Sequence, residues 1–359
     1  MFWQRYRGLI VFWLVIAVLA VLYYFTSFVV FVYSPASSSR DALVVDIPQG
    51  ASFRKITSLL HANKLVKDKT RFLILGKLRG AGSKIQAGEL EFRRNMTPGQ
   101  VLDKLMYGVP VSYAFVVPEG ANIYQIGDIL YSMELIKDPQ DFVNMAKNRV
   151  LIDELGVKAK SMEGYLFPDT YNIRKIKDLK DIIRMMHKKY REVFTPDMER
   201  RAHKMGMSEH EVVTLASIIE KETGAPEERR MISSVFHNRL RKGMPLQSDP
   251  TTIYGLWQTY DGNLTRDKLQ GYTPYNTYKI HGLPVGPISN PGRDAIIAAL
   301  YPEASDYIFF VSKNDGTHTF TVEYKDHLKA VNKFQMDPKQ RAGKSWRDLN
   351  KRRSSEAVN

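Results

Sequence analysis

Cysteine is absent from this chain of 359 residues. Its absence excludes a disulfide framework, a thiolate metal site and a cysteine nucleophile, and it leaves the redox compartment undetermined. The eight histidines include no HExxH string and no other pair at metal-ligand spacing, so we expect no catalytic metal. The GxSxG elbow of serine hydrolases and the glycine-rich loops of nucleotide-binding proteins are missing too.

Acidic residues are scarce relative to basic ones. The chain has 38 Asp and Glu against 52 Lys and Arg, which gives a net charge of +14. Such an excess indicates an anionic partner, such as nucleic acid, a membrane surface or an acidic polymer. The length allows two or three domains, and a hydrophobic fraction of 44% is enough for a packed core.

Charge is missing altogether between Arg7 and Arg40. Within this interval Leu9–Tyr33 is apolar apart from Thr26 and Ser27. As a helix, these 25 residues would be ~37 Å long, more than the ~30 Å of a bilayer's hydrocarbon core. We therefore expect a retained membrane anchor.

A cleaved signal peptide is the alternative interpretation of this segment. Ser34-Pro35-Ala36 loosely resembles a cleavage site, but a signal peptide has an apolar region of only about 7 to 15 residues. Arg5 and Arg7 precede the span, so the positive-inside bias puts the N-terminus in the cytoplasm and the rest of the chain outside. Because this topology puts the basic domain outside the cytoplasm, we do not expect nucleic acid to be its partner.

The chain beyond the anchor is expected to have an α+β fold. Val44–Ile47 and Ile85–Phe92 are typical of strands, and Ser52 and Asp68 are suitable N-caps for two helices between them. This βααβ order has the size of a small binding module. The predicted parts are a cytoplasmic N-terminus at 1–8, a transmembrane anchor at 9–33, a linker at 34–43, the small subdomain at 44–110, a larger mixed α+β domain at 111–335 and a disordered tail at 336–359.

The larger domain combines helices with irregular segments. Residues from about Lys177 to Met205 are helical and strongly basic, which indicates a solvated helix face or a contact with anionic lipid or polymer. Residues 244–292 are rich in Gly, Pro, Asn and Tyr, and long irregular stretches of this kind are usually functional. Residues 306–311 and 318–322 are expected to close as a hairpin.

The segment from Ser208 to Thr223 predicts a buried helix that ends in two carboxylates. A serine N-cap and Glu211 form a capping box, and the apolar residues that follow cover nearly the whole circumference. Glu220 and Glu222 come next, with side chains ~160° apart. A carboxyl in apolar surroundings resists ionisation, as a general acid near neutral pH must. Spacing alone does not choose between the two, nor does it exclude that both are solvated.

Two later clusters have the residue types of a sugar-binding cleft. Aromatic faces pack on pyranose rings, and amides, hydroxyls and carboxylates match sugar hydroxyl and acetamido groups. The alternative is that the tyrosines pack in the core and that the aspartate is a turn residue before Pro250. The candidates are Gln247, Ser248, Asp249 and Tyr254 in the first cluster and Tyr275, Asn276 and Tyr278 in the second.

Five sequence strings carry a resemblance to a known family. They are Glu163–Tyr171, Ala216–Glu222, Val235–Leu240, Leu246–Gly255 with its Gln-Ser-Asp-Pro-Thr core, and Tyr275–Tyr278. Together they resemble the MltG-type (YceG-like) endolytic murein transglycosylases, which are membrane-anchored bacterial enzymes that cut the glycan strands of peptidoglycan. The likeness covers nearly the whole chain after the anchor. One departure is Val285, where the family's string is Gly-Leu-Pro-Pro-Gly.

The resemblance implies that Glu220, rather than Glu222, is catalytic, and that the small subdomain is LysM-like. It implies a lyase that forms 1,6-anhydro-muramyl ends without a metal or cofactor, in cell-wall assembly and control of glycan length. Glu163, Asp169 and Glu222 are expected to support the site. The implied partners are peptidoglycan strands, the bacterial inner membrane and cell-wall synthases such as penicillin-binding proteins.

Two alternatives stay open at this point. The first is a non-catalytic, membrane-tethered protein that binds peptidoglycan through its small subdomain. The second is a glycan hydrolase with Asp249 or Glu222 as its second carboxylate, because hydrolases normally use a pair of carboxylates.

Overall fold

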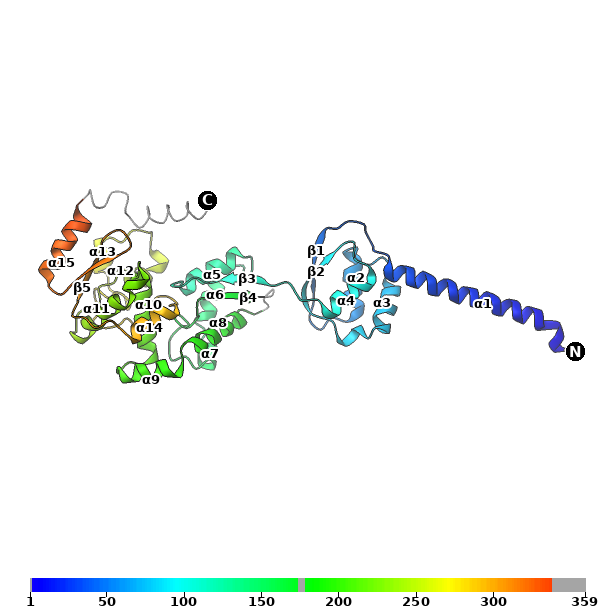
Figure 1. The fold of residues 1–359 in the computed structure, drawn as a ribbon, viewed down its shortest axis with the longest axis horizontal. Coiled ribbons are helices and arrows are strands. Elements are labelled where there is room, and N and C mark those ends of the chain that lie inside the picture. Colours follow the sequence, from blue (N-terminus) through cyan, green and yellow to red (C-terminus); the bar gives the residue numbers. More distant parts are fainter. Residues whose placement is uncertain (1, 174–177, 338–359) are drawn as a thin grey trace. The chain divides into compact units, whose positions relative to one another are not determined.

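The computed structural model describes residues 2–173 and 178–337, which divide into two compact units (Figure 1). The first unit holds the residues up to Ala114 together with Asn172 and Ile173. The second holds residues 115–171 and the described residues from 178 onward. The tail predicted at 336–359 lies outside the described residues, apart from its first two positions.

The first unit begins with the long helix α1 (Phe2–Tyr33). Its segment Gly8–Tyr33 is long and apolar enough to cross a membrane, as expected from the uncharged interval. The small subdomain that follows has the predicted βααβ order. Its elements are β1 (Ala42–Ile47), α2 (Phe53–Ala62), α3 (Lys69–Leu78), η1 (Ala81–Ser83), β2 (Gly88–Arg93) and α4 (Pro98–Tyr107).

The two strands of the subdomain form an antiparallel pair over a hydrophobic core. Val45 lies opposite Leu90, and both are buried together with Ile47 and Phe92. Alternate residues of a strand face the same side, so one face of the ribbon covers the helices and the other is exposed. The expected N-caps are confirmed: Ser52 accepts a hydrogen bond from the backbone of Lys55, and Asp68 accepts one from that of Arg71. (Thr97 and Gln100 form a capping box at α4.)

The second unit is mainly helical with short strands. The strand β3 (Tyr113–Val116) pairs with β4, and each of these two strands has residues assigned to both units. The further elements are α5 (Ile123–Ser132), α6 (Pro139–Ala146), α7 (Arg149–Glu154), β4 (Thr170–Ile173), α8 (Leu179–Val193), α9 (Pro196–Lys204), α10 (Glu209–Glu222), η2 (Pro226–Glu228), α11 (Arg229–Arg241), α12 (Asp249–Gly255), η3 (Trp257–Thr259), α13 (Arg266–Gln270), α14 (Arg293–Leu300), β5 (Phe309–Ser312), β6 (His318–Thr321), α15 (Tyr324–Val331) and η4 (Asn332–Met336).

Helix α10 runs through the core of the second unit. Every residue from Val212 to Ile219 is buried, because α14, α11, α12 and α9 all pack against it. The predicted capping box is confirmed: Ser208 accepts from the backbone of Glu211, whose carboxylate accepts from the Ser208 backbone in return. The helix therefore reaches the surface only at its ends, and its C-terminal end carries the two predicted glutamates.

Two sequence predictions can be compared directly with these elements. The hairpin is confirmed, since β5 and β6 pair antiparallel with Phe309 opposite Thr321. The basic segment is divided into α8 and α9 rather than continuous. Thr195 accepts a hydrogen bond from the Met198 backbone as N-cap, and Pro196 occupies the first turn of α9. A proline fits that position but not the interior of one long helix, which explains the break.

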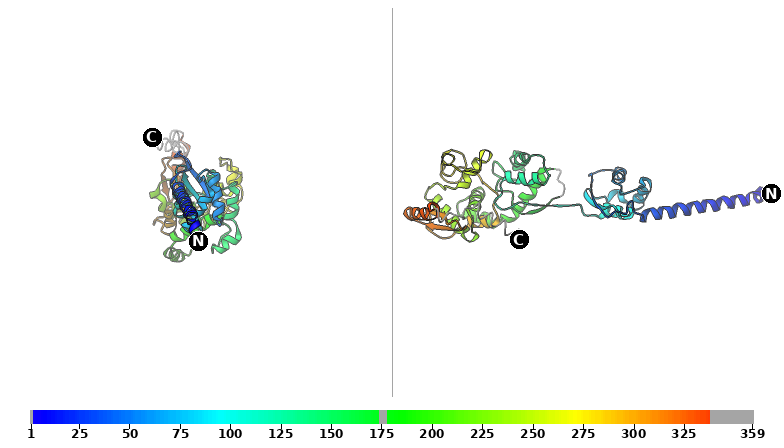
Figure 2. Two further views of the ribbon diagram at one scale, coloured as in Figure 1. Left: turned by 90° about the vertical axis from the view of Figure 1, so that its right-hand side faces the viewer. Right: turned by 90° about the horizontal axis from the view of Figure 1, so that it is seen from above.

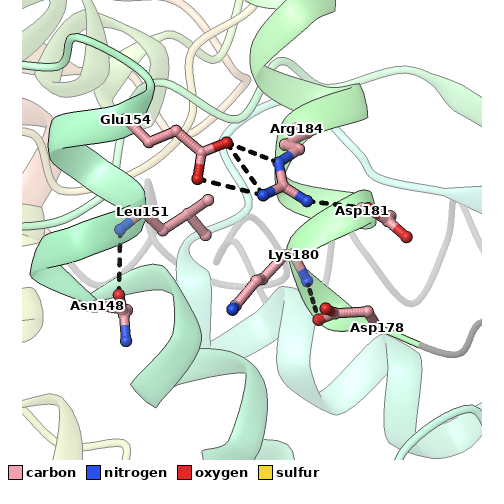
Figure 3. A network of polar contacts seen from close by, with 7 residues as sticks. All are labelled: Asn148, Leu151, Glu154, Asp178, Lys180, Asp181 and Arg184. Carbon is pink, nitrogen blue, oxygen red and sulfur yellow. Dashed lines mark hydrogen bonds and ion pairs between the residues drawn. The ribbon is translucent and has the colours of Figure 1, made fainter.

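Surface ion pairs tie α7 to α8 (Figure 3). The Arg184 guanidinium lies between Glu154 of α7, at 3.0 Å, and Asp181 of its own helix, at 3.1 Å. The caps Asn148 and Asp178 begin the two helices. These contacts link the two helices at the surface, and because they are exposed, each contributes little to stability.

Candidate active site

The Glu220 carboxyl lies at the C-terminal end of α10 and is only 9% exposed. Its Oε2 accepts a hydrogen bond of 3.0 Å from the backbone N–H of Gly292, the N-cap of α14. Its Oε1 lies 3.7 Å from the guanidinium of Arg229, the first residue of α11. The burial of α10 therefore brings one carboxyl to the meeting point of three helix ends.

Burial raises the pKa of Glu220 above its ordinary value. The Gly292 hydrogen bond and the positive charges of Arg229 and Lys221 lower this pKa, while the negative charge of Glu119 raises it. A carboxyl that keeps its proton toward neutral pH can act as a general acid. The sheltered environment expected at the end of this helix is therefore present at Glu220.

Glu119 is a neighbour of the site that the sequence did not indicate. A Cβ at Gly292 would lie 2.0 Å from its Oε1, so the Glu119 carboxylate rests directly against this glycine. The next residue, Gly120, has φ +74°, and a Cβ there would lie 3.4 Å from Glu220 Cγ. The turn after β3 thus packs on Glu220 and brings a second carboxylate to the same glycine.

A buried network fixes this turn beside the segment at 290–292. The Glu163 side chain is 1% exposed, and its carboxylate accepts from Asn290 Nδ2 at 3.0 Å, from the Ile123 N–H at 3.1 Å and from the Tyr254 hydroxyl at 2.9 Å. Burial raises the pKa of Glu163 to about 7, against the hydrogen bonds from Ile123 and Tyr254. Glu163 thus holds the frame around Glu220.

Asn290 joins that network to the acid. Its side-chain oxygen accepts from the backbones of Gly164 and Leu166, at 2.9 and 3.0 Å. Its own backbone N–H donates to the Ala121 carbonyl, and its carbonyl accepts from the Gly120 N–H, both at 2.9 Å. Since Gly292 is two residues further on, the network positions the N–H that Glu220 accepts.

Glu222 faces different partners. Its carboxylate accepts a hydrogen bond of 2.6 Å from the Ser248 hydroxyl. Burial raises the pKa of Glu222 to about 7, with the Asp249 charge raising it further and the Ser248 bond lowering it. The Tyr278 hydroxyl donates to Asp249 at 2.7 Å. The structure therefore brings three predicted residues, Ser248, Asp249 and Tyr278, together around Glu222.

Three further predicted residues, Asn276, Gln247 and Asp169, lie outside the immediate contacts of Glu220 and Glu222. Asn276 is fully buried, and its amide bonds to the backbones of Leu269 and Gly271 and to the Thr252 hydroxyl, so it holds a loop. Gln247 is exposed on the same loop system. Asp169 lies apart from the Glu163 network and pairs with Lys189 at 3.1 Å.

An aromatic group surrounds the buried Tyr254 hydroxyl. The rings of Tyr254 and Tyr275 meet edge to face at 4.8 Å, and Tyr124 stacks on Trp257 at 5.6 Å. Tyr124 and Trp257 were not among the predicted residues. The aromatic residues of the irregular segment at 244–292 are the available sequence signal for Trp257, whereas nothing in the sequence joins Tyr124 to it. Such a group suits the apolar face of a sugar ring.

Two hollows lie elsewhere on the second unit. They have volumes of about 600 and 480 Å³, both include His210, and Glu220 lines neither. No group of three or more His, Asp or Glu within residues 2–173 and 178–337 is arranged to hold a metal ion. The candidate site is therefore defined by the side-chain contacts around Glu220.

The chain is similar to several known proteins. It is 36% identical over 315 residues to an endolytic murein transglycosylase of Bacillus subtilis (strain 168), covering 82% of this chain and 86% of that relative. It is 29% identical over 325 residues to one of Streptococcus pneumoniae serotype 2 (strain D39 / NCTC 7466), of which it spans 59%, with 82% of this chain covered.

A solved structure and a family model match as well. The crystal structure of a YceG-like protein from Listeria monocytogenes aligns with a TM-score of 0.56 and 33% identity over 81% of this chain and 99% of that one. The family model described as the YceG-like family matches residues 45–333, which include Glu163, Glu220 and Asn290. The chain belongs to the YceG-like family.

Proposed function

We propose that the protein is a membrane-anchored endolytic murein transglycosylase that cleaves the bond between N-acetylmuramic acid and N-acetylglucosamine. The observation that carries this proposal is the Glu220 carboxyl, sheltered at the end of α10 with a raised pKa. The relatives named for this activity supply the substrate class. One sheltered acid is sufficient for a reaction in which the sugar itself provides the nucleophile.

In the proposed reaction Glu220 first donates its proton to the glycosidic oxygen. The bond from that oxygen to C1 of the muramyl ring breaks, and the leaving sugar departs with a new hydroxyl. The C6 oxygen of the same muramyl residue bonds to C1, and its proton passes to the Glu220 carboxylate. The product is a 1,6-anhydro end, no water is consumed, and the acid is restored. Such proton transfer contributes about 10²–10⁴-fold to the rate.

Glu119 is the second carboxylate of the proposed site. It rests against Gly292, beside Glu220, and its charge helps Glu220 to keep its proton. A negative charge there also favours the positive charge that develops on the sugar ring as the C1–O bond breaks. Glu119 therefore acts on both the acid and the transition state without forming a bond to the sugar.

The proposed substrate contacts divide into exposed and supporting residues. Gln247 and Asp249 are exposed, and Tyr275 and Tyr278 are partly exposed, so these four can touch a glycan. The supporting residues that hold the loops or the acid's frame are Ser248, Tyr254, Asn276, Glu163 and Glu222. Asp169, which pairs with Lys189, is the most remote candidate.

We further propose that α1 stays attached as a membrane anchor, with the N-terminus in the cytoplasm and the catalytic domain outside. Phe31 and Val32 near the end of α1 are buried in the core of the small subdomain. Cleavage near Ala36 would remove them and expose that core, which supports an anchor over a signal peptide. The subdomain at 44–110, with its antiparallel βααβ order, is proposed to be LysM-like and to bind peptidoglycan, and 111–335 to be the catalytic domain.

The direct test is the purified Glu220→Gln variant on isolated glycan strands. We expect its turnover to fall by about 10²–10⁴-fold, because the amide has no proton to donate. The exposed Glu227 makes a matched control, and Glu227→Gln should cut at the parent rate. If Glu220→Gln cuts as fast as the parent, another residue donates the proton, and if neither protein cuts, the chain only binds peptidoglycan.

Glu222 is the acid that a two-carboxylate hydrolase would use, since its pKa is also raised, to about 7. In that case Glu222→Gln would lose as much turnover as Glu220→Gln. Under our proposal Glu222→Gln loses less than about tenfold, because glutamine still accepts the Ser248 hydrogen bond and the proton donor is intact.

A further inference from the structure

The last turns of helix α1 pack against the small subdomain, and the rest of the helix runs outward from it (Figures 1 and 2). Phe31 and Val32 are 9% and 8% exposed and belong to the subdomain's core, and Phe28 packs against the same core. A Cβ at Gly99 of α4 would lie 3.4 Å from Val32 Cγ1. The last turns of α1 are therefore one folded body with the subdomain.

The uncovered part of α1 has the length of a bilayer core. The apolar segment begins at Gly8, and the subdomain starts to cover the helix at Phe28. The 20 residues from Gly8 to Ser27 span ~30 Å at ~1.5 Å per residue, which equals the thickness of the hydrocarbon region. If α1 spans the membrane as proposed, the subdomain starts where the hydrocarbon ends, at the level of the lipid headgroups.

Charge is distributed unevenly over the subdomain. The surface formed by residues 53–84, which we call the basic face, comprises α2, α3 and the turns that follow them. The strands β1 and β2 carry the three acids Asp46, Glu89 and Glu91 against the single base Arg93, with Asp46 paired opposite Glu89. The basic face has nine Lys and Arg against the single acid Asp68: Arg54, Lys55, Lys64, Lys67, Lys69, Arg71, Lys77, Arg79 and Lys84.

Helix α3 brings this charge close to the membrane helix. It contacts α1, and Figure 1 shows it at the end of the subdomain from which α1 leaves, with β1 and β2 at the other end. Ile74 and Leu78, one turn apart, are 47% and 72% exposed, and Lys77 lies between them. Exposed apolar residues next to lysines are typical of helices that lie in the interfacial layer of a bilayer.

We propose that the basic face is a docking surface for the anionic phospholipid headgroups of the leaflet from which α1 emerges. This inference rests on the proposed membrane anchoring of α1. Lys and Arg within a few ångströms of an anionic leaflet are attracted to it, and this attraction falls off within a Debye length. Ile74 and Leu78 enter the interfacial layer, and the subdomain is held against the membrane surface.

The absence of cysteine makes this arrangement measurable by site-specific labelling. A single cysteine at Leu78 or at the exposed Glu91 of β2 takes one environment-sensitive fluorophore. The full-length chain is reconstituted in vesicles of phosphatidylcholine alone or mixed with phosphatidylglycerol, with a quencher on the lipid headgroups. We expect strong quenching at position 78 that increases severalfold with phosphatidylglycerol and decreases in high salt, and weak quenching at position 91.

Charge reversal separates the contribution of the basic face from that of the anchor. In the triple variant Lys67→Glu, Lys69→Glu, Lys77→Glu, the increase with phosphatidylglycerol should disappear while the protein still floats with the vesicles. Equal quenching at positions 78 and 91, or quenching at 78 that appears only when glycan fragments are added, overturns the inference. A parent protein that fails to float contradicts the proposed anchoring instead.

Discussion

Glu163 carries three hydrogen bonds on a single buried carboxylate. One oxygen accepts from Asn290, and the other accepts from Ile123 and Tyr254. Asn290 cannot turn its amide round, because its own oxygen accepts from the backbones of Gly164 and Leu166. Both side-chain oxygens of residue 163 must therefore accept hydrogen bonds.

Glu163→Gln should destabilise the second unit by about 1–3 kcal/mol, since the glutamine NH₂ must face another donor. Chemical denaturation at neutral pH measures this loss. The exposed pair of Asp169 with Lys189 provides the control, and Asp169→Asn should change the free energy of unfolding by less than about 0.5 kcal/mol. Equal effects of the two variants would show that the buried network is not formed.

Because burial raises the pKa of Glu222, we expect the stability of the protein to depend on pH. Its pKa is raised from 4.5 to about 7 in the folded state, so the folded state holds the proton more tightly than the unfolded state. Its favourable contribution is present below about pH 4.5 and is lost as the pH rises through about 7. The parent should lose on the order of 3 kcal/mol relative to Glu222→Gln across this window.

Taking the difference between these two proteins removes the other titrating groups. Burial lowers the pKa of His187 and His237, and these histidines give stability the opposite slope with pH. Denaturation of both proteins at several pH values measures the difference. A difference that is flat between pH 4.5 and 7 contradicts the burial of this carboxyl.

The sequence could predict a sheltered carboxyl but not all of its neighbours. Local periodicity is enough to bury α10 and to place Glu220 and Glu222 at its end, because the apolar residues surround the helix. Glu119 and Gly292 are far apart in the chain, and they meet only because Glu163 and Asn290 join their segments. A contact between residues so far apart in the sequence cannot be predicted from local periodicity.

At the scale of elements, the N-terminus of α14 determines the surroundings of the acid. Gly292 donates its N–H to Glu220 and leaves room for the Glu119 carboxylate. Its φ of −72° is open to any residue, so the glycine is required for space rather than for backbone conformation. The N-terminus of α14 therefore supplies a backbone N–H to Glu220 and the space that the Glu119 carboxylate occupies.

Gly292→Ala should therefore mimic Glu119→Gln. The added Cβ moves the Glu119 carboxylate away from Gly292 but keeps the N–H donor, whereas Glu119→Gln neutralises this side chain. Both variants therefore weaken the negative charge that raises the pKa of Glu220. The alkaline limb of kcat/KM should move to lower pH in both, with less than about a tenfold loss at the optimum, because the proton donor remains.

The pH profile of glycan cleavage measures that shift. Gly271→Ala is the matched control, because its φ is −67° and a Cβ there would make only an ordinary contact of 3.5 Å. An alkaline limb that stays in place in both Gly292→Ala and Glu119→Gln would exclude Glu119 from the site.

Element prediction succeeded where a local signal was strong. The capping box of α10, the N-caps of α2 and α3 and the hairpin follow from short-range patterns, whereas the break between α8 and α9 depends on Pro196 in the first turn of α9. The irregular stretch at 244–292 contains α12 and α13, short helices whose stability comes from tertiary contacts rather than from their sequence.

At the scale of the whole molecule, the chain joins an apolar helix, long enough to cross a membrane, and a small subdomain to a unit that carries the Glu220 site. The family match places residues 45–333 in one family, and the apolar helix precedes it. Under the proposed function, Glu220 cuts glycan strands without consuming water.

Mass spectrometry of the products formed from purified glycan strands by the full-length protein tests that claim most directly. We expect muramyl ends in the 1,6-anhydro form, each lighter by one water molecule than a hydrolytic end, and we expect these ends to be lost with Glu220→Gln. Products with predominantly reducing muramyl ends would contradict it.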